Sequence, residues 1–280
     1  MKNIHKIFLA FGIFSIIFLI FTPYFTEDFM DLRQKQENEA IAKAELDAKK
    51  AAEKAREDAQ KKIYLLGKFE PAERDDFVSV PEKYNISGRK IYARKETLEA
   101  FEKMAESAEK NSIELNITSA TRNFDYQKEL WEKKWTGTTF VEGKKLPESV
   151  PNGQERFEKI LEYSAVPGTS RHHWGTDIDI NGVDPKYFET REGEKVYEWL
   201  KENAPLFGFC QTYDEKGITR FSGYNEEKWH WSYLPLARGF TQEYKNLIRD
   251  EDIAGFLGDE YIAQENLINN YVLSINPECI

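Results

Sequence analysis

Histidine and cysteine are scarce in this sequence of 280 residues, which contains 4 histidines and 2 cysteines. The cysteines, Cys210 and Cys279, form no metal-binding pattern, and the sequence leaves open whether they pair or stay as free thiols. Apart from His5 in the N-terminal apolar region, every histidine falls in one of two short stretches. Positive charge is also in deficit. The net charge of −10 excludes the basic footprint of a nucleic-acid-binding protein.

A long apolar run lies at the N-terminus. Residues 7–25 are almost wholly apolar, and a helix of that length spans about 28 Å, enough to cross the hydrocarbon core of a bilayer. Lys2 and Lys6 precede the run, which favours a cytoplasmic N-terminus and export of the rest of the chain. A cleaved signal peptide is the alternative, but no small-x-small cleavage site follows. We predict an uncleaved signal-anchor over residues 1–26 and a single-pass membrane protein whose main domain faces the periplasm or the cell exterior.

Glycine and proline are absent from residues 32–66, which are rich in Ala, Lys, Glu and Gln. This composition favours helix. A thin alanine stripe is compatible with a weak coiled coil that self-associates, and equally with a single solvated helix. We therefore predict four segments after the anchor: a helical stalk over 27–66, a linker over 67–85, a main domain over 86–240 and a mostly helical extension over 241–280.

The main domain alternates between helical and strand periodicity. Apolar spacing predicts helices over 96–110, 154–163 and 194–204, and a further helix that Asn123 caps. Strand patterns cover 113–118, 207–213, 217–221 and a last segment around His230. In that segment Trp229, Trp231 and Tyr233 share one face while His230 takes the other. Separate helices and short alternating strands predict an α+β fold, a small antiparallel sheet with helices packed against it.

The two histidine-bearing stretches supply the candidate metal ligands. The first runs from Pro167 to Asp179 (PGTSRHHWGTDID) and the second from Glu227 to Trp231 (EKWHW). Two imidazoles and a carboxylate form a three-ligand set that leaves Zn²⁺ one open position for water. A glutamate three residues before His230 provides a base for that water. Because three is an odd step along a strand, we expect the strand to begin after Glu227 and leave this carboxylate on a bend.

These stretches resemble the VanY/VanX-type D-Ala-D-Ala metallopeptidase family. Ser170-x-His172-x-x-Gly175-x-x-x-Asp179 is similar to its first zinc motif, and Glu227-x-Trp229-His230 is similar to its second. Upstream, the segment 118–122 (TSATR) with Gln127 resembles the part that presents an arginine to the substrate. The resemblance runs from about Ile113 to Tyr233.

The resemblance implies a role for each matched residue. One Zn²⁺ is implied on His172, Asp179 and His230, with Glu227 as the catalytic base. Arg122 is implied to stabilise the developing oxyanion or to hold a substrate carboxylate. Gln127 and Ser170 are implied to line the substrate cleft. The implied fold is the same α+β architecture with a single zinc site.

Two positions leave the ligand assignment open. Asp177 stands where the family has a small apolar residue, and it points to the same side of a strand as Asp179. It is therefore either a rival ligand or a group that orients a ligand histidine from behind. His173 is likewise a rival to His172.

The implied reaction is zinc-dependent hydrolysis of a peptide that ends in a D-amino acid. Predicted export makes peptidoglycan stem peptides the expected substrate, and the first hypothesis is a D-alanyl-D-alanine carboxypeptidase. An L,D-carboxypeptidase or a peptidoglycan endopeptidase on the same scaffold is the second. The third is a non-catalytic zinc-holding protein that binds the cell wall. Glu227 argues against the third, because a binding protein has no need of a base.

Overall fold

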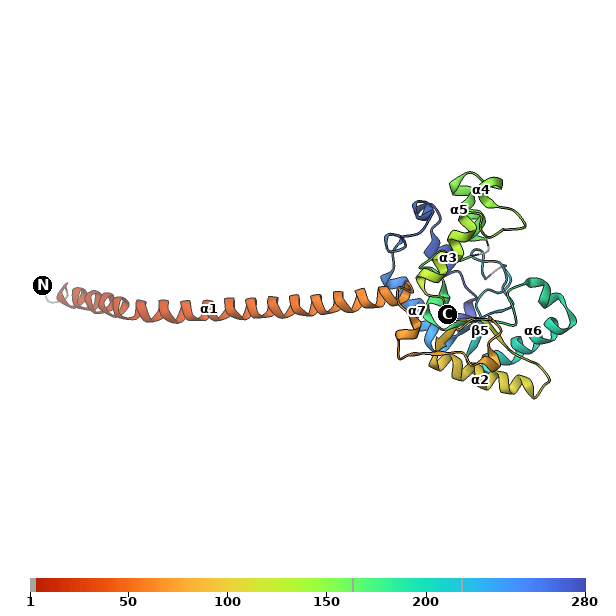
Figure 1. The fold of residues 1–280 in the computed structure, drawn as a ribbon. Coiled ribbons are helices and arrows are strands. Elements are labelled where there is room, and N and C mark those ends of the chain that lie inside the picture. The colour runs from red at the N-terminus through yellow and green to blue at the C-terminus, as the bar shows by residue number, and fades with distance from the viewer. Residues whose placement is uncertain (1–3, 163, 218) are drawn as a thin grey trace. The chain divides into compact units, whose positions relative to one another are not determined.

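The computed structural model describes residues 4–162, 164–217 and 219–280, with side chains from residue 29 onward (Figure 1). The chain divides into two units, one that ends at Asp58 and one from Ala59 to Ile280. The first consists of most of the helix α1 (Ile4–Leu65), as the composition of residues 32–66 predicted. Side chains 29–57 of α1 are all exposed.

Among the described residues, no helix is both long enough and sufficiently apolar to cross a membrane. The predicted signal-anchor, residues 1–26, lies outside the residues whose side chains are described. It therefore stays a prediction.

The second unit is built on a four-stranded antiparallel sheet. Its strands, in spatial order, are β3 (Ile117–Ser119), β4 (Asp177–Ile180), β6 (His230–Tyr233) and β5 (Phe209–Gln211). A separate antiparallel pair consists of β1 (Phe77–Ser79) and β2 (Tyr92–Arg94). The predicted α+β class with a small antiparallel sheet is confirmed.

Helices pack around this sheet, with α2 below it and α3 and α5 above it in Figure 1. They are α2 (Lys95–Glu109), α3 (Phe124–Trp135), α4 (Leu146–Ser149), α5 (Gly153–Leu161), α6 (Arg191–Asn203) and α7 (Leu234–Leu247). The helices predicted over 96–110, 154–163 and 194–204 are confirmed as α2, α5 and α6. Asn123 caps α3 as predicted, because its side chain accepts a hydrogen bond from the Tyr126 N–H at 2.9 Å.

Alternation along the central strands separates an apolar face from a polar one. Ile178 of β4 and Trp231 of β6 are buried in one core with Phe101 of α2 and Leu200 of α6. A second core lies among α3, α5, α7 and the C-terminal segment, and includes Trp131, Phe157, Trp174 and Tyr244. Since side chains alternate along a strand, Asp179 and His230 project from the other face of the sheet than Ile178 and Trp231.

The strand predicted over 217–221 is wrong. Its described residues form no strand, and the Gly217 N–H instead donates to the Arg220 carbonyl at 2.9 Å. The Arg220 side chain is buried and binds Asp214 (2.8 Å) and the carbonyl of Tyr224 (2.7 Å). These hydrogen bonds between neighbouring residues hold the described part of the segment as a loop, and they outweigh its alternating pattern.

The segment after α7 is less helical than predicted. Past Leu247 the described chain makes short 3₁₀ turns and one π-helical turn, Ile268–Val272. Gly255 and Gly258 have φ values of +100° and +94°, which interrupt a right-handed helix. The segment nevertheless packs against the rest of the second unit, because Leu267 and Val272 are buried in the second core.

A disulfide joins Cys210 on β5 to Cys279 near the C-terminus, with the two Cα atoms 5.7 Å apart. This bond resolves the pairing that the sequence left open. It fastens the end of the extension to the edge strand of the central sheet, 69 residues earlier in the chain.

Candidate metal centre and substrate cleft

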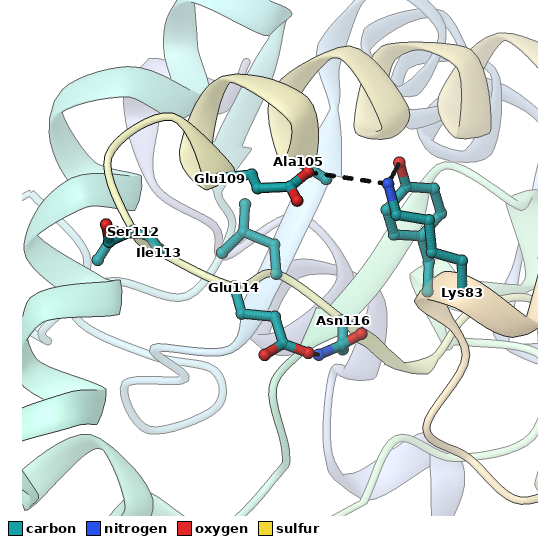
Figure 2. Close-up of a pocket in the computed structure, with 9 residues that line it drawn as sticks. Lys83, Ala105, Glu109, Ser112, Ile113, Glu114 and Asn116 are labelled. Carbon is teal, nitrogen blue, oxygen red and sulfur yellow. Dashed lines mark hydrogen bonds and ion pairs between the residues drawn. The ribbon is translucent and has the colours of Figure 1, made fainter.

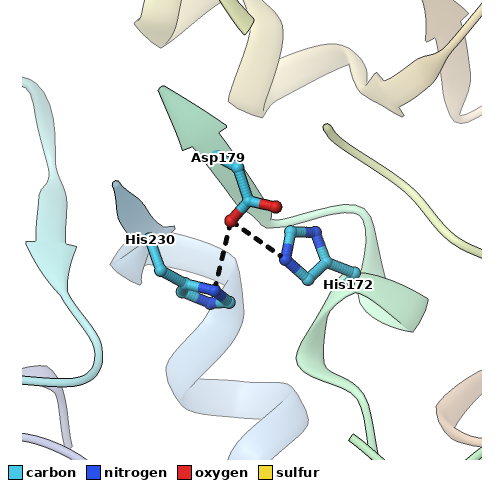
Figure 3. A group of neighbouring side chains, drawn as sticks. All are labelled: His172, Asp179 and His230. Carbon is cyan, nitrogen blue, oxygen red and sulfur yellow. Dashed lines mark ion pairs between the residues drawn. The ribbon is translucent and has the colours of Figure 1, made fainter. Parts of the chain in front are cut away.

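The register of β4 and β6 brings two of the predicted ligands together. Asp179 lies directly opposite His230 in the antiparallel pair, where facing Cβ atoms are about 4.5–5.5 Å apart. His172 comes from the 3₁₀ turn Arg171–Trp174 that precedes β4. Gly175 ends this turn with φ +74°, and a Cβ atom there would lie 2.4 Å from the Phe77 ring. The turn returns the chain so that His172 faces Asp179 and His230 (Figure 3).

The distances within this group match a shared metal ion better than direct hydrogen bonds. Asp179 Oδ1 is 3.4 Å from His172 Nε2 and 3.4 Å from His230 Nδ1. Two ligand atoms about 2.1 Å from a tetrahedral Zn²⁺ would lie about 3.4 Å apart. Within the described part of the chain, His172 Nε2 and Asp179 Oδ1 are buried and have no hydrogen-bond partner. Two imidazoles and a carboxylate, with two of the three candidate ligand atoms unpaired, therefore fit Zn²⁺.

Outer partners set the tautomer of each histidine. His172 Nδ1 lies 2.8 Å from the Ala120 carbonyl and donates to it, so that the Nε2 lone pair faces the group. His230 Nε2 lies 2.9 Å from Asp177 Oδ2 and donates to it, so that Nδ1 faces the group. Such partners fix ring orientation and raise the basicity of a ligand nitrogen.

The charges around the group favour a cation at its centre. Burial, and then the charge of Arg122, lower the pKa of His172. Burial also opposes the protonation of His230, but the carboxylates of Asp177, Asp179 and Glu227 raise its pKa well above the ordinary value. The same negative charge that stabilises a proton on His230 would stabilise a metal ion in its place.

Asp177 is an outer partner and not a member of the ligand group. It is fully buried and accepts hydrogen bonds from His230, from Arg171 Nε (3.0 Å) and from Ser232 Oγ (2.8 Å). The Arg171 guanidinium, also buried, continues to Thr241 at 2.9 Å. Burial opposes the charge of Asp177, but Arg171 and His230 hold its pKa well below the ordinary value. Of the two roles that the sequence left open, the orienting role fits this geometry.

His173 is also outside the ligand group. Its Nε2 accepts the Gly168 N–H at 3.0 Å, and its Nδ1 donates to the Arg122 carbonyl. Burial lowers the pKa of His173 to about 3, so the ring is neutral and both nitrogens are used in the fold.

Glu227 lies on the bend that the spacing predicted. Its carbonyl accepts the His230 N–H at 3.2 Å, and its own N–H donates to the Tyr213 carbonyl at 2.9 Å, so that β6 begins only at His230. Glu227 Oε2 is 3.3 Å from His230 Nδ1. The Glu227 side chain is 25% exposed, whereas those of His230 and Asp179 are almost fully buried. A carboxylate thus stands at the solvent side of the ligand group.

A cavity of about 450 Å³ opens onto the ligand group. All of the predicted site residues line it: Arg122, Gln127, Ser170, His172, Asp179, Glu227 and His230. Within the described residues, the Arg122 Nε and Gln127 Oε1 atoms are buried without a hydrogen-bond partner. Unpaired polar atoms on residues that line a cavity are candidates to bind a peptide there.

A second hollow, of about 380 Å³, contains none of the predicted site residues (Figure 2). Its polar side chains pair with each other, Lys83 with Glu109 at 3.8 Å and Asn116 with Glu114 at 2.9 Å. The ligand group and the unpaired polar atoms make the first cavity the candidate active site.

Residues 90–236 match the family model described as VanY: D-alanyl-D-alanine carboxypeptidase. The chain belongs to the VanY family. A putative carboxypeptidase of Bacillus subtilis, YodJ, is 29% identical over 203 residues, which are 69% of this chain and 62% of the relative. A D-alanyl-D-alanine carboxypeptidase of Enterococcus faecalis is 35% identical over 89 residues, 31% of each chain. The chain thus spans less than two thirds of the length of these two curated relatives.

Solved structures of similar fold include the LD-carboxypeptidase LdcB, which is 23% identical. The match covers 70% of this chain and 80% of that one, with a TM-score of 0.46.

This VanY-family chain also has cleft residues that the sequence patterns did not identify. Arg171 adjoins His172 in the first motif, and Lys134 follows Gln127 by seven residues on α3. Helical spacing from Gln127 was the available signal for Lys134.

The Arg171–Asp177 pair yields separate predictions for zinc and for stability. Asp177→Ala is expected to weaken zinc affinity by roughly 10–100-fold, because His230 loses its outer partner. It should also lower the free energy of unfolding by about 3–5 kcal/mol, because Arg171 is left buried without a counter-charge. Zinc titration and denaturant unfolding measure the two effects.

The double variant Arg171→Met/Asp177→Ala is the matched control. Removal of both charges should restore most of the stability and none of the zinc affinity, since the outer partner of His230 is still missing. Unchanged zinc affinity in either variant would contradict the orienting role of Asp177.

Proposed function

We propose that this chain is a zinc-dependent D-alanyl-D-alanine carboxypeptidase that removes the terminal D-amino acid from peptidoglycan stem peptides. The observation that carries the proposal is the position of Glu227. Its carboxylate lies 3.3 Å from His230 Nδ1, at the cavity side of a His-Asp-His group in which His172 Nε2 and Asp179 Oδ1 have no partner among the described residues. Membership of the VanY family supports the proposal that the bond cleaved is the one before the terminal D-amino acid.

The protein groups divide the hydrolysis between them. Zn²⁺ on His172, Asp179 and His230 would supply Lewis acidity at the scissile carbonyl and lower the pKa of water. Glu227 accepts a proton from the water as its oxygen bonds to the carbonyl carbon. It then returns this proton to the leaving amine as the C–N bond breaks. The products are a free D-alanine and a peptide one residue shorter.

Arg122 is the cation of the cleft next to the ligand group. The backbone N–H of Arg122 donates to the His172 carbonyl at 3.2 Å, which fixes Arg122 beside the proposed metal ligands. Its buried Nε is without a partner in the described residues and is available to negative charge on the substrate. Hydrogen bonds of this kind to developing charge contribute about 3–4 kcal/mol in hydrolases.

Defined stem peptides test the activity. The full chain, loaded with zinc, is incubated with pentapeptides that end in D-Ala-D-Ala and with tetrapeptides that end in one D-Ala, and the products are identified by mass. Release of D-Ala from the pentapeptide, abolished by a chelator and restored by zinc, is expected.

Other products would change the proposal. Release only from the tetrapeptide would indicate an L,D-carboxypeptidase, and internal cleavage an endopeptidase. Absence of any zinc-dependent product, with the peptide bound, would favour the non-catalytic protein.

We further propose that residues 1–26 anchor the chain in a membrane with the second unit exported. The apolar run 7–25 behind Lys2 and Lys6 supports the anchor and its orientation. The Cys210–Cys279 disulfide supports export, because disulfides persist in oxidising compartments and are rare in the cytosol.

Labelling of a single new thiol tests this topology. Ala52 is exposed on α1, and the described chain has no free cysteine, so that Ala52→Cys is a clean reporter. A membrane-impermeant thiol reagent is expected to label it on intact cells or spheroplasts as well as after lysis. Labelling only after lysis would refute export, and a soluble mature form that starts near Thr26 would refute the anchor alone.

A further inference from the structure

One face of α3 runs along the cavity. Gln127 and Lys134 are seven residues apart, two helical turns, and both line the cavity with Leu130 between them. Gln127 Nε2 donates to the Ala165 carbonyl at 2.7 Å, and Lys134 Nζ donates to Ser164 Oγ. The face of α3 and the segment 164–165 therefore form one wall of the cleft.

Lys134 on this wall and Arg122 on the same cavity have no carboxylate partner among the described residues. Other lysines of α3 do: Lys133 pairs with Glu129, and Lys128 lies 3.9 Å from Glu132. Lys134 is half-buried, and its described partner is only the Ser164 hydroxyl. Arg122, on the same cavity, has a buried Nε without a partner among the described residues. A buried charge is costly until a counter-charge pairs with it.

Arg122 lies on the same cavity as Lys134. Its backbone N–H donates to the His172 carbonyl at 3.2 Å, which places Arg122 beside the ligand group. Burial, and then Arg122, lower the pKa of Lys134 to about 8, which is the response of an ammonium group that lacks an anion. Because both residues line one cavity and neither has a carboxylate partner among the described residues, an anionic group of a bound ligand could pair with both.

A peptide held for removal of its last residue brings an anion to this place. One residue spans at most about 3.6 Å, so a terminal carboxylate must lie close to the scissile carbonyl at the metal ligands. We propose that Lys134 joins Arg122 in binding the C-terminal carboxylate of the peptide, and that Lys134 thereby determines specificity for exopeptidase cleavage. This inference rests on the proposed function, and it assigns Lys134 a role in that reaction.

The test compares two peptides that differ only at the terminus. One ends in D-Ala-D-Ala with a free carboxylate, and the other ends in the carboxamide of the same sequence. The zinc-loaded full chain should prefer the free acid in kcat/KM by about 10- to 100-fold, the effect of a hydrogen bond to a charged group. Lys134→Met should lower kcat/KM for the free acid by a similar factor, mainly through KM, and leave the carboxamide unchanged.

Two further variants keep the test specific. Lys133→Met makes the same change on the same helix at an exposed residue, and should alter neither peptide. Lys134→Arg keeps the positive charge and should retain most of the preference. Methionine preserves the apolar stem of Lys134, so the packing of α3 is maintained.

Several results would overturn the inference. The first is an equal loss of kcat/KM for both peptides in Lys134→Met, and the second is no loss of kcat/KM for either peptide. The third is a loss of kcat/KM that depends on an acidic side chain of the peptide and not on its C-terminal carboxylate. If wild type cleaves neither peptide, the proposed function fails by itself. Calorimetric binding of both peptides to Glu227→Gln, with and without Lys134→Met, then decides the subsite: selective loss of the free acid supports it, and equal affinities refute it.

Discussion

Replacement of Glu227 by glutamine is expected to lower the release of D-Ala by roughly 10²–10⁴-fold, the usual contribution of general acid–base catalysis. The amide keeps the size of the side chain and loses the proton acceptor beside His230. Because Glu227 is outside the His-Asp-His group, the variant should bind zinc in the same amount as wild type. Product release and zinc content, measured on the same preparation, separate the two effects.

Glu226 provides the matched control. It is the neighbouring carboxylate of the same cavity, but its side chain accepts a hydrogen bond from the Tyr197 hydroxyl at 3.0 Å. Glu226→Gln therefore makes the same chemical change away from His230 and should have a much smaller effect. Equal turnover by wild type and Glu227→Gln would show that another group is the base, and Asp177 would be the next carboxylate to replace.

Removal of a single ligand is expected to abolish stoichiometric zinc binding. His172→Ala and His230→Ala each leave two protein ligands, fewer than the three of a catalytic zinc site, and hydrolysis should fall to background. Zinc content after dialysis, by elemental analysis, measures this. Retention of one zinc per chain in His230→Ala would disprove the assignment.

His173→Ala is the control for histidine removal. Its ring nitrogens bind Gly168 and Arg122, and loss of these hydrogen bonds should destabilise the fold by about 1–3 kcal/mol for each group left unpaired. Zinc should nevertheless remain bound. Loss of zinc from a folded His173→Ala protein would reopen the choice between His172 and His173.

Local patterns predicted the elements, and tertiary pairing decided their extent. Helical spacing was sufficient for α2, α5 and α6, because each carries its own apolar face. The strand predicted over 113–118 forms only at 117–119, since the Ile113 N–H turns back to the Ala108 carbonyl and the Asn116 N–H binds the Asn181 side chain. Such competing partners lie outside the segment itself.

The site was predictable to the extent that its residues lie in short motifs. Alternation around His230 predicted the bend at Glu227. The strand register that places Asp179 opposite His230 pairs two segments that are about fifty residues apart in the sequence. A local sequence pattern does not specify this register. Likewise, Asp177 was identified as unusual, but its partner Arg171 and their common burial depend on Ser232 and Thr241, which follow much later in the chain.

The disulfide between Cys210 and Cys279 also affects what happens to the protein when a protease cuts its backbone. Glu227 and His230 both lie inside the closed loop, as does the stretch 219–223, where Phe221 is 82% exposed. Exposed turns of this kind are the preferred places for proteolytic nicking. A single break there would open the backbone and leave the two pieces covalently joined through the cystine. The fragment that bears the proposed base and one of the ligands would therefore not diffuse away.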